Sequence, residues 1–318
     1  MKVLFMGTPA YSIPTLRALE NEGHNIVSVY TKPDSWSGRG RQKSMPPLKE
    51  YAILKGIPLK QPYKLSDESK DVDEILSSDA DVIVVAAYGI ILPPRVISRP
   101  SLGCLNVHPS LLPKYRGPSP VASAILNDEA IVGVSIMLLD EGVDTGPILA
   151  QQEIPVYKNE NCQELTQRLF VSGANLMPDT LLKWAQGSIV PLEQNHDYAS
   201  ISKYLKKSNS EIDWEDTARD ISLAVRAYYP WPGKHTFYSG KILKIIEADY
   251  SSDNRFDPGV IDTSGVVSVG TGSGTLILSK VQIEGKSITS GREFANGQHG
   301  INGSLLGTKW TFHDRDSS

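Results

Sequence analysis

The stretch GCLNVHPSLLPKYRG (103–117) decides most of the fold, because in it an apolar strand ends on polar side chains. Alternate side chains of an extended strand point to the same face, so Asn106 and His108 are predicted to project into one cleft. Pro109 and Pro113 cannot continue a hydrogen-bonded ladder, so the chain is predicted to leave the sheet directly after His108. The strand therefore ends where its polar side chains begin.

Strand-like and helix-like segments alternate around this stretch through about residue 190. The continuous apolar run DVIVVAA is typical of a strand that is buried on both faces, as in parallel sheets. Strands are predicted at 2–7, 25–31, 81–87, 104–108, 132–139 and 147–156, and helices at 14–22, 45–55 and 162–186. This order predicts parallel strands with right-handed crossovers, in a doubly wound, Rossmann-like α/β domain. Ligands of such sheets bind beyond the carboxyl ends of the strands, which is where His108 lies.

The pattern changes after residue 190. The next twenty residues are polar and charged and predict a linker. A helix at 217–229 and then short strands between Gly, Ser and Asp turns predict a small, closed, OB-like β-barrel. The predicted organisation is a catalytic domain at 1–190, a linker at 191–210, a C-terminal OB-like domain at 211–307 and a disordered tail at 308–318.

Composition and length describe a protein of two domains without a membrane segment. The chain has 318 residues, 40% of them hydrophobic, and a net charge of −4, and one core seldom supports this length. The longest apolar run, from Val82, stops at Pro93, short of the roughly 20 residues that span a membrane. Met1 leads directly into a predicted strand, so we expect a cytoplasmic protein. Cys104 and Cys162 form no C-x-x-C motif and the six His residues are scattered, so we expect no disulfide and no metal.

Asn106, His108 and Asp144 suggest a particular chemistry. Without a Ser or Cys nucleophile, they suit acyl transfer to an acceptor that brings its own nucleophile. The Asn106 amide could hold an oxyanion, an effect worth about 3–4 kcal/mol where such a donor has been removed. His108 would add proton transfer or a second donor, and Asp144 would orient the imidazole or take a proton through water. Taken singly, each has a structural explanation: a hydrogen-bonded His after a strand, an Asn that caps a turn, an Asp in a turn.

Together with SLLPKYRG, these three residues resemble the folate-dependent formyltransferases, which move a formyl group from 10-formyltetrahydrofolate to an amine. The resemblance covers nearly the whole chain and is greatest to the branch whose acceptor is methionyl initiator tRNA. It is carried further by KVLFMGTPAYSIPTLRAL (2–19), TKPDSWSGRGRQ (31–42), VVAAYGIILP (84–93) and RAYYPWPGKHTF (226–237). It implies that Asn106, His108 and Asp144 are the catalytic residues. Pro109 stands where many bacterial members have a small residue, which leaves the three catalytic positions unchanged.

A folate pocket is predicted around VVAAYGIILP, which provides a strand end, a glycine and aliphatic walls. The candidate folate-binding residues are Ala87, Tyr88, Gly89, Ile91, Leu92, Ser110, Leu111, Leu112, Pro113 and Asp140. The alternative is a simple core strand, which we favour for Val85.

A tRNA contact is predicted in the segment 32–49, which sets Lys32, Arg39, Arg41, Lys43 and Lys49 among Pro, Gly and Ser. Positive charge suits a phosphate backbone and Trp36 suits an unpaired base, although a solvated loop has the same composition. The resemblance implies that this loop enters the tRNA acceptor stem and that Arg39 carries most of the recognition. OB folds commonly bind nucleic acid, although the barrel could be only structural. The candidate tRNA contacts are Trp36, Arg39, Arg41, Lys43, Lys206 and Lys207, with Arg226, Lys241, Lys244 and Arg292 as further candidates.

Other functions remain possible at this stage. A dinucleotide-dependent oxidoreductase would need G-x-G-x-x-G after the first strand, where this chain has Gly7, Thr8, Pro9 and Ala10. Related formyltransferases that act on glycinamide ribonucleotide or a nucleotide sugar, and a formylfolate hydrolase, share the predicted chemistry. A folate- or RNA-binding protein without catalysis would not need all three polar residues. We expect a monomer.

Overall fold

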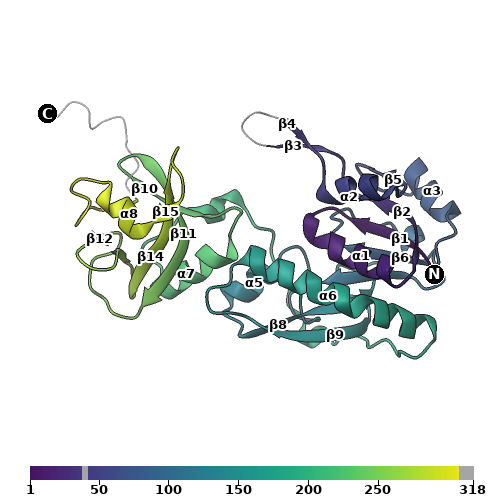
Figure 1. Cartoon of the computed structure of the whole chain (residues 1–318). Coiled ribbons are helices and arrows are strands. Elements are labelled where there is room, and N and C mark those ends of the chain that lie inside the picture. The colour runs from purple at the N-terminus through teal and green to yellow at the C-terminus, as the bar shows by residue number, and fades with distance from the viewer. Residues whose placement is uncertain (38–41, 308–318) are drawn as a thin grey trace. The chain divides into compact units, whose positions relative to one another are not determined.

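The computed structural model describes residues 1–37 and 42–307, which form two compact units (Figure 1). The first unit comprises 1–120, 130–156 and 165–202. The second comprises 121–129, 157–164 and the chain from 203 onward. Arg39, Arg41 and the predicted tail at 308–318 lie outside the described residues.

The first unit is built on a 7-stranded sheet in the order β5-β2-β1-β6-β7-β8-β9. Its parallel strands are β1 (Lys2–Gly7), β2 (Asn25–Tyr30), β5 (Leu59–Lys60), β6 (Val82–Ala86) and β7 (Cys104–His108). The strand order reverses at β1, which pairs with β2 on one side and β6 on the other. The Rossmann-like fold predicted from the alternation of apolar strands and helices is thereby confirmed.

The expectation that all strands run parallel is wrong for β8 (Ile131–Leu138) and β9 (Ile148–Pro155). β8 pairs with β7 and with β9 in antiparallel register. A parallel return would need a crossover that packs along the sheet. The helix between β7 and β8, α5 (Pro120–Leu126), is one of the shorter helices, and most of it belongs to the second unit. β8 therefore starts at the edge where β7 ends and runs back beside it.

Both faces of the sheet are covered, as the continuous apolar strands require. On one face, Val3 and Phe5 of β1 pack in a core with α1 (Ile13–Asn21), α2 (Pro47–Lys55) and α6 (Cys162–Ala185). On the other face, Leu4 and Met6 pack with α3 (Lys70–Ser77) and α4 (Pro94–Ile97). Sequence periodicity did not identify α3, which is short and highly charged. Its N-terminus is capped by the Ser69 hydroxyl, which accepts from the Val72 N–H.

A two-stranded hairpin follows β2 at the carboxyl edge of the sheet. β3 (Ser35–Ser37) pairs antiparallel with β4 (Gln42–Ser44), and the chain then returns into α2 (Figure 1). Ser35 lies opposite Ser44 and Trp36 opposite Lys43. The segment predicted as a basic loop is therefore a hairpin in its described part.

The second unit is an antiparallel β domain with its own core. Its strands are β10 (Lys234–Tyr238), β11 (Lys241–Ser251), β12 (Ile261–Asp262), β13 (Ser268–Gly270), β14 (Thr275–Ile283) and β15 (Thr289–Ser290), with helices α7 (Ala218–Ala227) and α8 (Gly291–Asn296). Strand pairing follows the open order β10-β11-β14-β13-β12, and β15 pairs with β14. Leu243, Leu276 and Val281 are among its fully buried residues. Within the part of the chain that is described, no helix is long and apolar enough to cross a membrane.

The segment predicted as a linker is bonded to the first unit over its first half. Leu192 forms a bridge with Ile148, and Ile201 forms one with Arg116. Two short 3-10 helices, η2 (His196–Tyr198) and η3 (Lys207–Ser210), follow along the segment. A third, η1 (Ala10–Ser12), precedes α1.

Candidate active site

β7 presents Asn106 and His108 on one face, as the alternation of a strand requires. In the sheet register, Asn106 lies between Val85 of β6 and Met137 of β8. Its side chain is half-buried, and in the described part of the chain its amide makes no hydrogen bond to another residue. An amide donor is thus available at the carboxyl end of a central strand.

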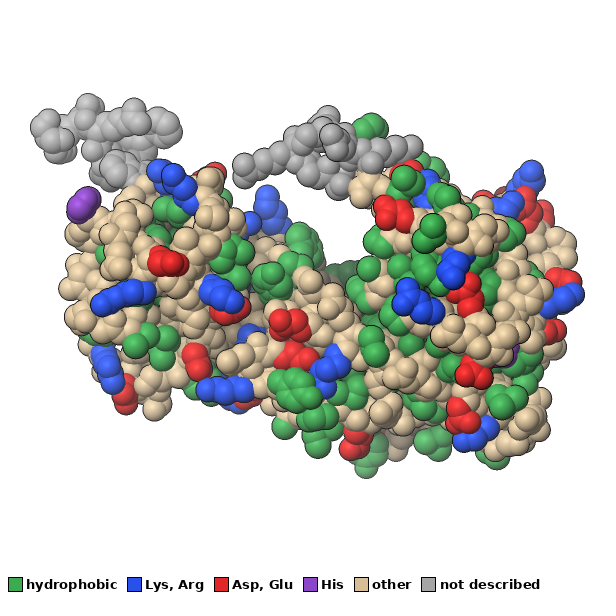
Figure 2. Space-filling view, in the orientation of Figure 1, with side chains coloured by type: hydrophobic (Ala, Val, Ile, Leu, Met, Phe, Trp, Pro, Cys, Tyr) green, Lys and Arg blue, Asp and Glu red, His purple; other side chains and the backbone are tan. Residues whose placement is uncertain are grey.

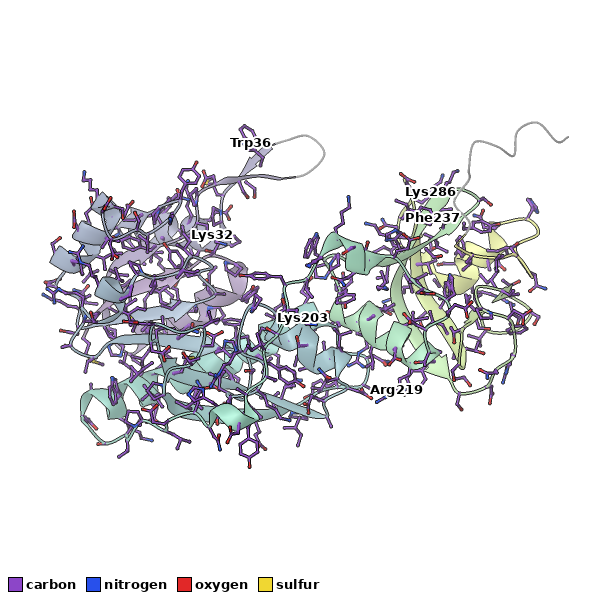
Figure 3. All side chains as sticks on the ribbon, turned by 180° about the vertical axis from the view of Figure 1, so that it is seen from behind. Lys32, Trp36, Lys203, Arg219, Phe237 and Lys286 are labelled. Carbon is purple, nitrogen blue, oxygen red and sulfur yellow. The ribbon has the colours of Figure 1, made fainter. Side chains whose placement is uncertain are left out.

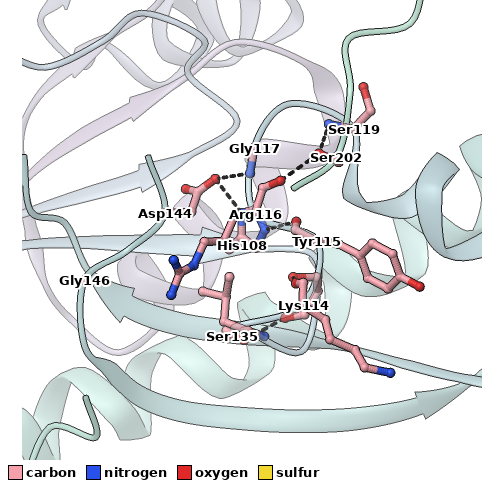
Figure 4. A network of polar contacts seen from close by, with 12 residues as sticks. His108, Lys114, Tyr115, Arg116, Gly117, Ser119, Ser135, Asp144, Gly146 and Ser202 are labelled. Atoms are coloured by element: carbon pink, nitrogen blue, oxygen red, sulfur yellow. Dashed lines mark hydrogen bonds and ion pairs between the residues drawn. The ribbon is translucent and has the colours of Figure 1, made fainter. Parts of the chain in front are cut away.

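Asp144 reaches the same place from the loop between β8 and β9. Its Oδ2 lies 3.6 Å from His108 Nδ1, and the two side chains are 15% and 5% exposed. The same oxygen accepts a hydrogen bond of 2.8 Å from the Gly117 N–H (Figure 4). The backbone of Asp144 is left-handed, with φ at 53°, a conformation that costs a non-glycine residue free energy and is found often at functional sites. The loop therefore delivers a carboxylate to the end of β7.

His108 is enclosed by acceptors on both sides. Its Nε2 lies 3.1 Å from the carbonyl oxygen of Tyr115, so we place a proton on Nε2. Its Nδ1 faces the Asp144 carboxylate (Figure 4). To donate directly to a substrate oxyanion, the ring would have to release one of these partners, so in this arrangement the Asn106 amide is the more accessible donor.

The turn after β7 is fixed by its own hydrogen bonds. The Ser110 hydroxyl donates to the Lys114 carbonyl at 2.7 Å, and the Leu112 N–H donates to the Ser135 hydroxyl at 3.2 Å. The Gln151 amide donates to the Leu112 carbonyl at 2.9 Å. This turn holds the Tyr115 carbonyl that bonds to His108.

A buried polar network that sequence reasoning missed lies behind Asp144. Gln194 donates from Nε2 to the backbone carbonyls of Asp144 at 3.0 Å and Gly146 at 2.6 Å. Its Oε1 accepts from Nε and Nη2 of Arg116 at 2.9 and 2.7 Å. Nη1 of Arg116 lies 3.1 Å from Nδ1 of His196. Arg116 and Gln194 are each only 6% exposed, so this network fixes the backbone of the loop that carries Asp144.

A pocket of about 390 Å³ lies near the predicted folate residues. It is lined by Lys64, Leu65, Ile90, Ile91, Leu92, Pro93, Pro94 and Glu141. Ile91 and Leu92 were predicted from sequence; Lys64 and Glu141 were not, because nothing in their local sequence marks them. Ile91 is 87% exposed. The wall is mainly apolar, with one cation and one anion at its margin.

Three further predicted folate residues, Ala87, Tyr88 and Gly89, form the turn after β6 and do not line this pocket. Ala87 and Gly89 have positive φ, at 52° and 75°. The Tyr88 side chain is buried in the core, its hydroxyl has no partner in the described chain, and burial raises its pKa. The Tyr88 carbonyl accepts from the Thr8 hydroxyl at 2.9 Å. Tyr88 can therefore meet a ligand only through its main chain.

The remaining predicted folate residues occupy two places. Asp140 shapes the loop before Asp144: its Oδ1 accepts from the Gly142 N–H at 3.1 Å and the Thr145 hydroxyl at 2.7 Å. Ser110, Leu111, Leu112 and Pro113 belong to the turn after β7, where Ser110 and Leu112 are buried. None of these five lines the pocket described above.

The predicted tRNA contacts differ in their surroundings. Trp36 is 72% exposed, and Lys206 and Lys207 are exposed on the second unit. Lys43 lies opposite Trp36 in the hairpin. The Lys49 ammonium is already paired with a carboxylate, because its Nζ lies 2.7 and 2.8 Å from the two carboxylate oxygens of Asp34.

Arg226 also differs from the expectation of a phosphate contact. It is partly buried, its Nε donates to the Glu160 carbonyl at 3.0 Å, and burial lowers its pKa. Lys241, Lys244 and Arg292 are exposed. Figure 2 shows acidic and basic side chains interspersed over the visible face, in keeping with the net charge of −4. Among the residues described, no three His, Cys, Asp or Glu side chains gather as metal ligands would.

Comparison with known proteins extends these observations. Residues 1–181 match the model of the formyl transferase family, and residues 204–299 match that of the formyl transferase C-terminal domain. A protein of Chloroflexus aurantiacus named methionyl-tRNA formyltransferase is 44% identical over 306 residues, which cover 95% of this chain and 98% of that protein. Proteins with the same name from Caldanaerobacter subterraneus and Coxiella burnetii are 37% and 38% identical, over 96% and 93% of this chain and 100% and 95% of their own.

Solved structures share the fold at lower identity. An N-formyltransferase of Helicobacter canadensis, in complex with folinic acid and dTDP-3-aminofucose, superposes with a TM-score of 0.66 at 18% identity. The match covers 87% of this chain and 98% of that one. HypX of Aquifex aeolicus, in complex with tetrahydrofolic acid, superposes with a TM-score of 0.63 at 18% identity, over 96% of this chain and 48% of that one. At these identities the likeness establishes the fold.

Proposed function

The chain belongs to the formyl transferase family, and from that membership we propose that it transfers a formyl group from 10-formyltetrahydrofolate to the α-amino group of methionyl initiator tRNA. The observation that carries this proposal is the likeness over nearly the full length, at 37–44% identity, to proteins named for this reaction. The contact between His108 and Asp144 at the end of β7 supplies chemistry that suits it.

The reaction begins when the unprotonated amine of the acceptor attacks the formyl carbon. A C–N bond forms, and the formyl oxygen takes up negative charge in a tetrahedral intermediate. Asn106, whose amide has no other partner among the described residues, donates a hydrogen bond to this oxygen. The intermediate then collapses, the bond from the formyl carbon to N10 of the folate breaks, and N10 takes up a proton.

The amine must lose a proton in this sequence. Asp144 accepts it through a water molecule and passes it on to N10, which conserves protons over the reaction. The contact between Asp144 and His108 Nδ1 lets the pair share this proton while N10 becomes basic. Gly117 N–H and the Gln194 network hold the carboxylate in place during the transfer.

We place the folate ring system beside Ile91 and Leu92, with backbone groups of the turn at Ala87–Gly89 as polar contacts. The exposed Trp36 and the hairpin that carries it, with Arg39, Arg41 and Lys43, form the proposed tRNA contact of the first unit. Lys206 and Lys207 form that of the second. We assign a catalytic domain to 1–190, a connecting segment to 191–210 and a tRNA-contacting domain to 211–307. The two family matches, at 1–181 and 204–299, support a division into two domains, and the second match begins within the proposed connecting segment. Since its acceptor is a translation substrate, we place the protein in the cytoplasm, acting as a monomer.

The test offers the purified chain 10-formyltetrahydrofolate with one acceptor at a time. These are methionyl initiator tRNA, uncharged tRNA, glycinamide ribonucleotide and a dTDP-linked amino sugar. Formylation of methionyl-tRNA alone, lost in Asn106→Ala, is the expected result. Transfer to a small amine instead, or formate release without an acceptor, would overturn the tRNA assignment while keeping the chemistry of the site.

A further inference from the structure

The hairpin β3–β4 is fastened to the first unit by a cluster of polar side chains at its base. Asp34, the last residue before β3, receives both carboxylate contacts of Lys49, at 2.7 and 2.8 Å. The Nε2 of Gln61 donates to the same carboxylate at 3.0 Å and to the Lys32 carbonyl at 2.9 Å. Three segments, the connection between β2 and β3, helix α2 and the chain after β5, therefore meet at one carboxylate.

This cluster is more enclosed than an ordinary surface ion pair. The Lys49 and Asp34 side chains are 16% and 15% exposed. By comparison, the neighbouring pair of Lys60 with Glu74, at 2.5 Å, is 42% and 32% exposed. Enclosed charges lose hydration, so such a pair persists only when its geometry and its additional hydrogen bonds compensate. Here the Gln61 amide provides that additional bond.

The backbone that leads into the hairpin is fixed as well. The Thr31 N–H donates to the Lys60 carbonyl at 3.0 Å, and the Lys32 N–H lies 3.4 Å from the Thr8 hydroxyl. That hydroxyl donates to the Tyr88 carbonyl, in the turn assigned to the folate pocket. Residues 31, 32 and 34 are thus each held in place before the chain enters β3.

The hairpin itself extends beyond this fixed base. Figure 3 shows Trp36 out on the hairpin and Lys32 near its base, and Trp36 is 72% exposed. A two-stranded hairpin is marginally stable on its own. Its direction must therefore be set by the residues at its base.

We propose that Asp34, Lys49 and Gln61 are positioning residues that hold the hairpin β3–β4 in the direction needed to engage the acceptor tRNA. The inference rests on the proposed function, because it assigns the hairpin to the tRNA substrate. Lys49 contributes to tRNA binding through Asp34 and does not contact a phosphate. We call these three residues the anchor of the hairpin. Fixing the hairpin before tRNA binds reduces the conformational entropy lost on binding. The anchor therefore acts on the affinity for the acceptor tRNA and leaves the chemical step unchanged.

The experiment compares Lys49→Met and Asp34→Asn with the matched control Lys60→Met, which breaks the more exposed pair with Glu74. Steady-state kinetics give KM for methionyl-tRNA, KM for 10-formyltetrahydrofolate and kcat, and thermal unfolding gives Tm. We expect the two anchor variants to raise KM for methionyl-tRNA about tenfold or more, while kcat and the donor KM stay within about twofold. Lys49→Arg, which keeps a cation opposite Asp34, should restore most of the affinity. Asp34→Asn preserves shape and remains the test if Lys49→Met lowers Tm.

A second arm shows whether the anchor acts through the hairpin. Ser35 and Ser44 are paired, so residues 36–43 can be replaced by two glycines that close a short turn. This variant should raise KM for methionyl-tRNA, and adding Lys49→Met to it should change KM no further.

The outcomes separate the two proposals. A wild-type chain that formylates no tRNA overturns the proposed function and the anchor with it. If the wild type formylates methionyl-tRNA but Lys49→Met and Asp34→Asn match Lys60→Met in KM, the anchor alone is overturned. The same conclusion follows if Lys49→Met still raises KM after the hairpin has been replaced, since its effect would not pass through the hairpin.

Discussion

Gln194 both accepts hydrogen bonds from the buried Arg116 and donates hydrogen bonds to the backbone of the loop that carries Asp144. Replacing Gln194 by Glu separates these two functions. The new carboxylate still accepts from Nε and Nη2 of Arg116, which now gains an ion pair in a site where both residues are 6% exposed. The other carboxylate oxygen, however, replaces an N–H that donates to the carbonyls of Asp144 and Gly146. Two donated hydrogen bonds become repulsive contacts between oxygens, and the loop must move away.

The magnitudes follow from these contacts. An ion pair with Arg116 is worth more than the charge-assisted hydrogen bonds to a neutral amide that it replaces. The two buried carbonyls that lose their donor cost about 1–3 kcal/mol each, or about 2–6 kcal/mol together. The stronger contact with Arg116 offsets part of this cost, so the free energy of unfolding should fall by less than about 6 kcal/mol. Asp144 is held at a φ of 53°, and a displacement of its carboxylate by about 1 Å costs on the order of 100-fold in rate. Activity should therefore fall much more than stability.

The assay is single-turnover formyl transfer to methionyl-tRNA, paired with urea unfolding followed by circular dichroism. Gln194→Leu removes all four hydrogen bonds and should lower both activity and stability, the latter by about 3–5 kcal/mol because the Arg116 charge is left buried. Gln152→Leu is the control, since the Gln152 side chain bonds only Ser172 among the contacts described. A Gln194→Glu protein with the wild-type rate of transfer would refute the claim that this amide positions Asp144.

Three further predictions concern single residues. Asn106→Ala should lower the single-turnover rate by about 100- to 1,000-fold with little change in donor binding, because it removes the oxyanion donor; a smaller fall than tenfold would assign that role elsewhere. Gly89→Ala should weaken binding of 10-formyltetrahydrofolate in a titration, since φ at this position is +75°, a conformation that a side chain rarely adopts, so the backbone of the turn must shift; unchanged affinity would exclude this turn from the folate site. Burial raises the pKa of the Cys104 thiol from 9.0 to about 12, so the folded state binds the proton more tightly than the unfolded chain. The contribution of this thiol to stability is fully present below the unfolded pKa of 9.0 and should be lost at about 1.4 kcal/mol per pH unit between pH 9 and the folded pKa of about 12. Cys104→Ala should abolish this component in urea midpoints compared at pH 8 and pH 10.

The predictions from sequence held where local geometry determines the outcome. Alternation along an extended strand was enough to place Asn106 and His108 on one face of β7, and Pro109 ended the strand after His108. The apolar runs of β1 and β6 identified buried parallel strands because both of their faces meet helices. These features depend on neighbours within a few residues.

The direction of β8 illustrates what local pattern leaves undetermined. The run at 132–139 has the same apolar character whether the strand runs parallel or antiparallel to β7. The direction depends on where the preceding segment packs, and α5 joins the second unit instead of crossing the first sheet. Strand direction is thus set by contacts of the connection, which the strand's own sequence does not record.

The segment at 191–202 shows the same limitation at the active site. Its polar composition predicted a linker, because exposed polar residues and buried hydrogen-bonded ones look alike in a sequence. Gln194 is buried because Arg116, 78 positions earlier in the chain, carries a charge into the same place and needs an acceptor there. Arg116 in turn lies on the turn that follows His108. The polar residues that position Asp144 could be recognised only once the fold had brought the turn, the loop and this segment together, so polar segments that border a predicted catalytic turn should be tested for buried partners before they are treated as linkers.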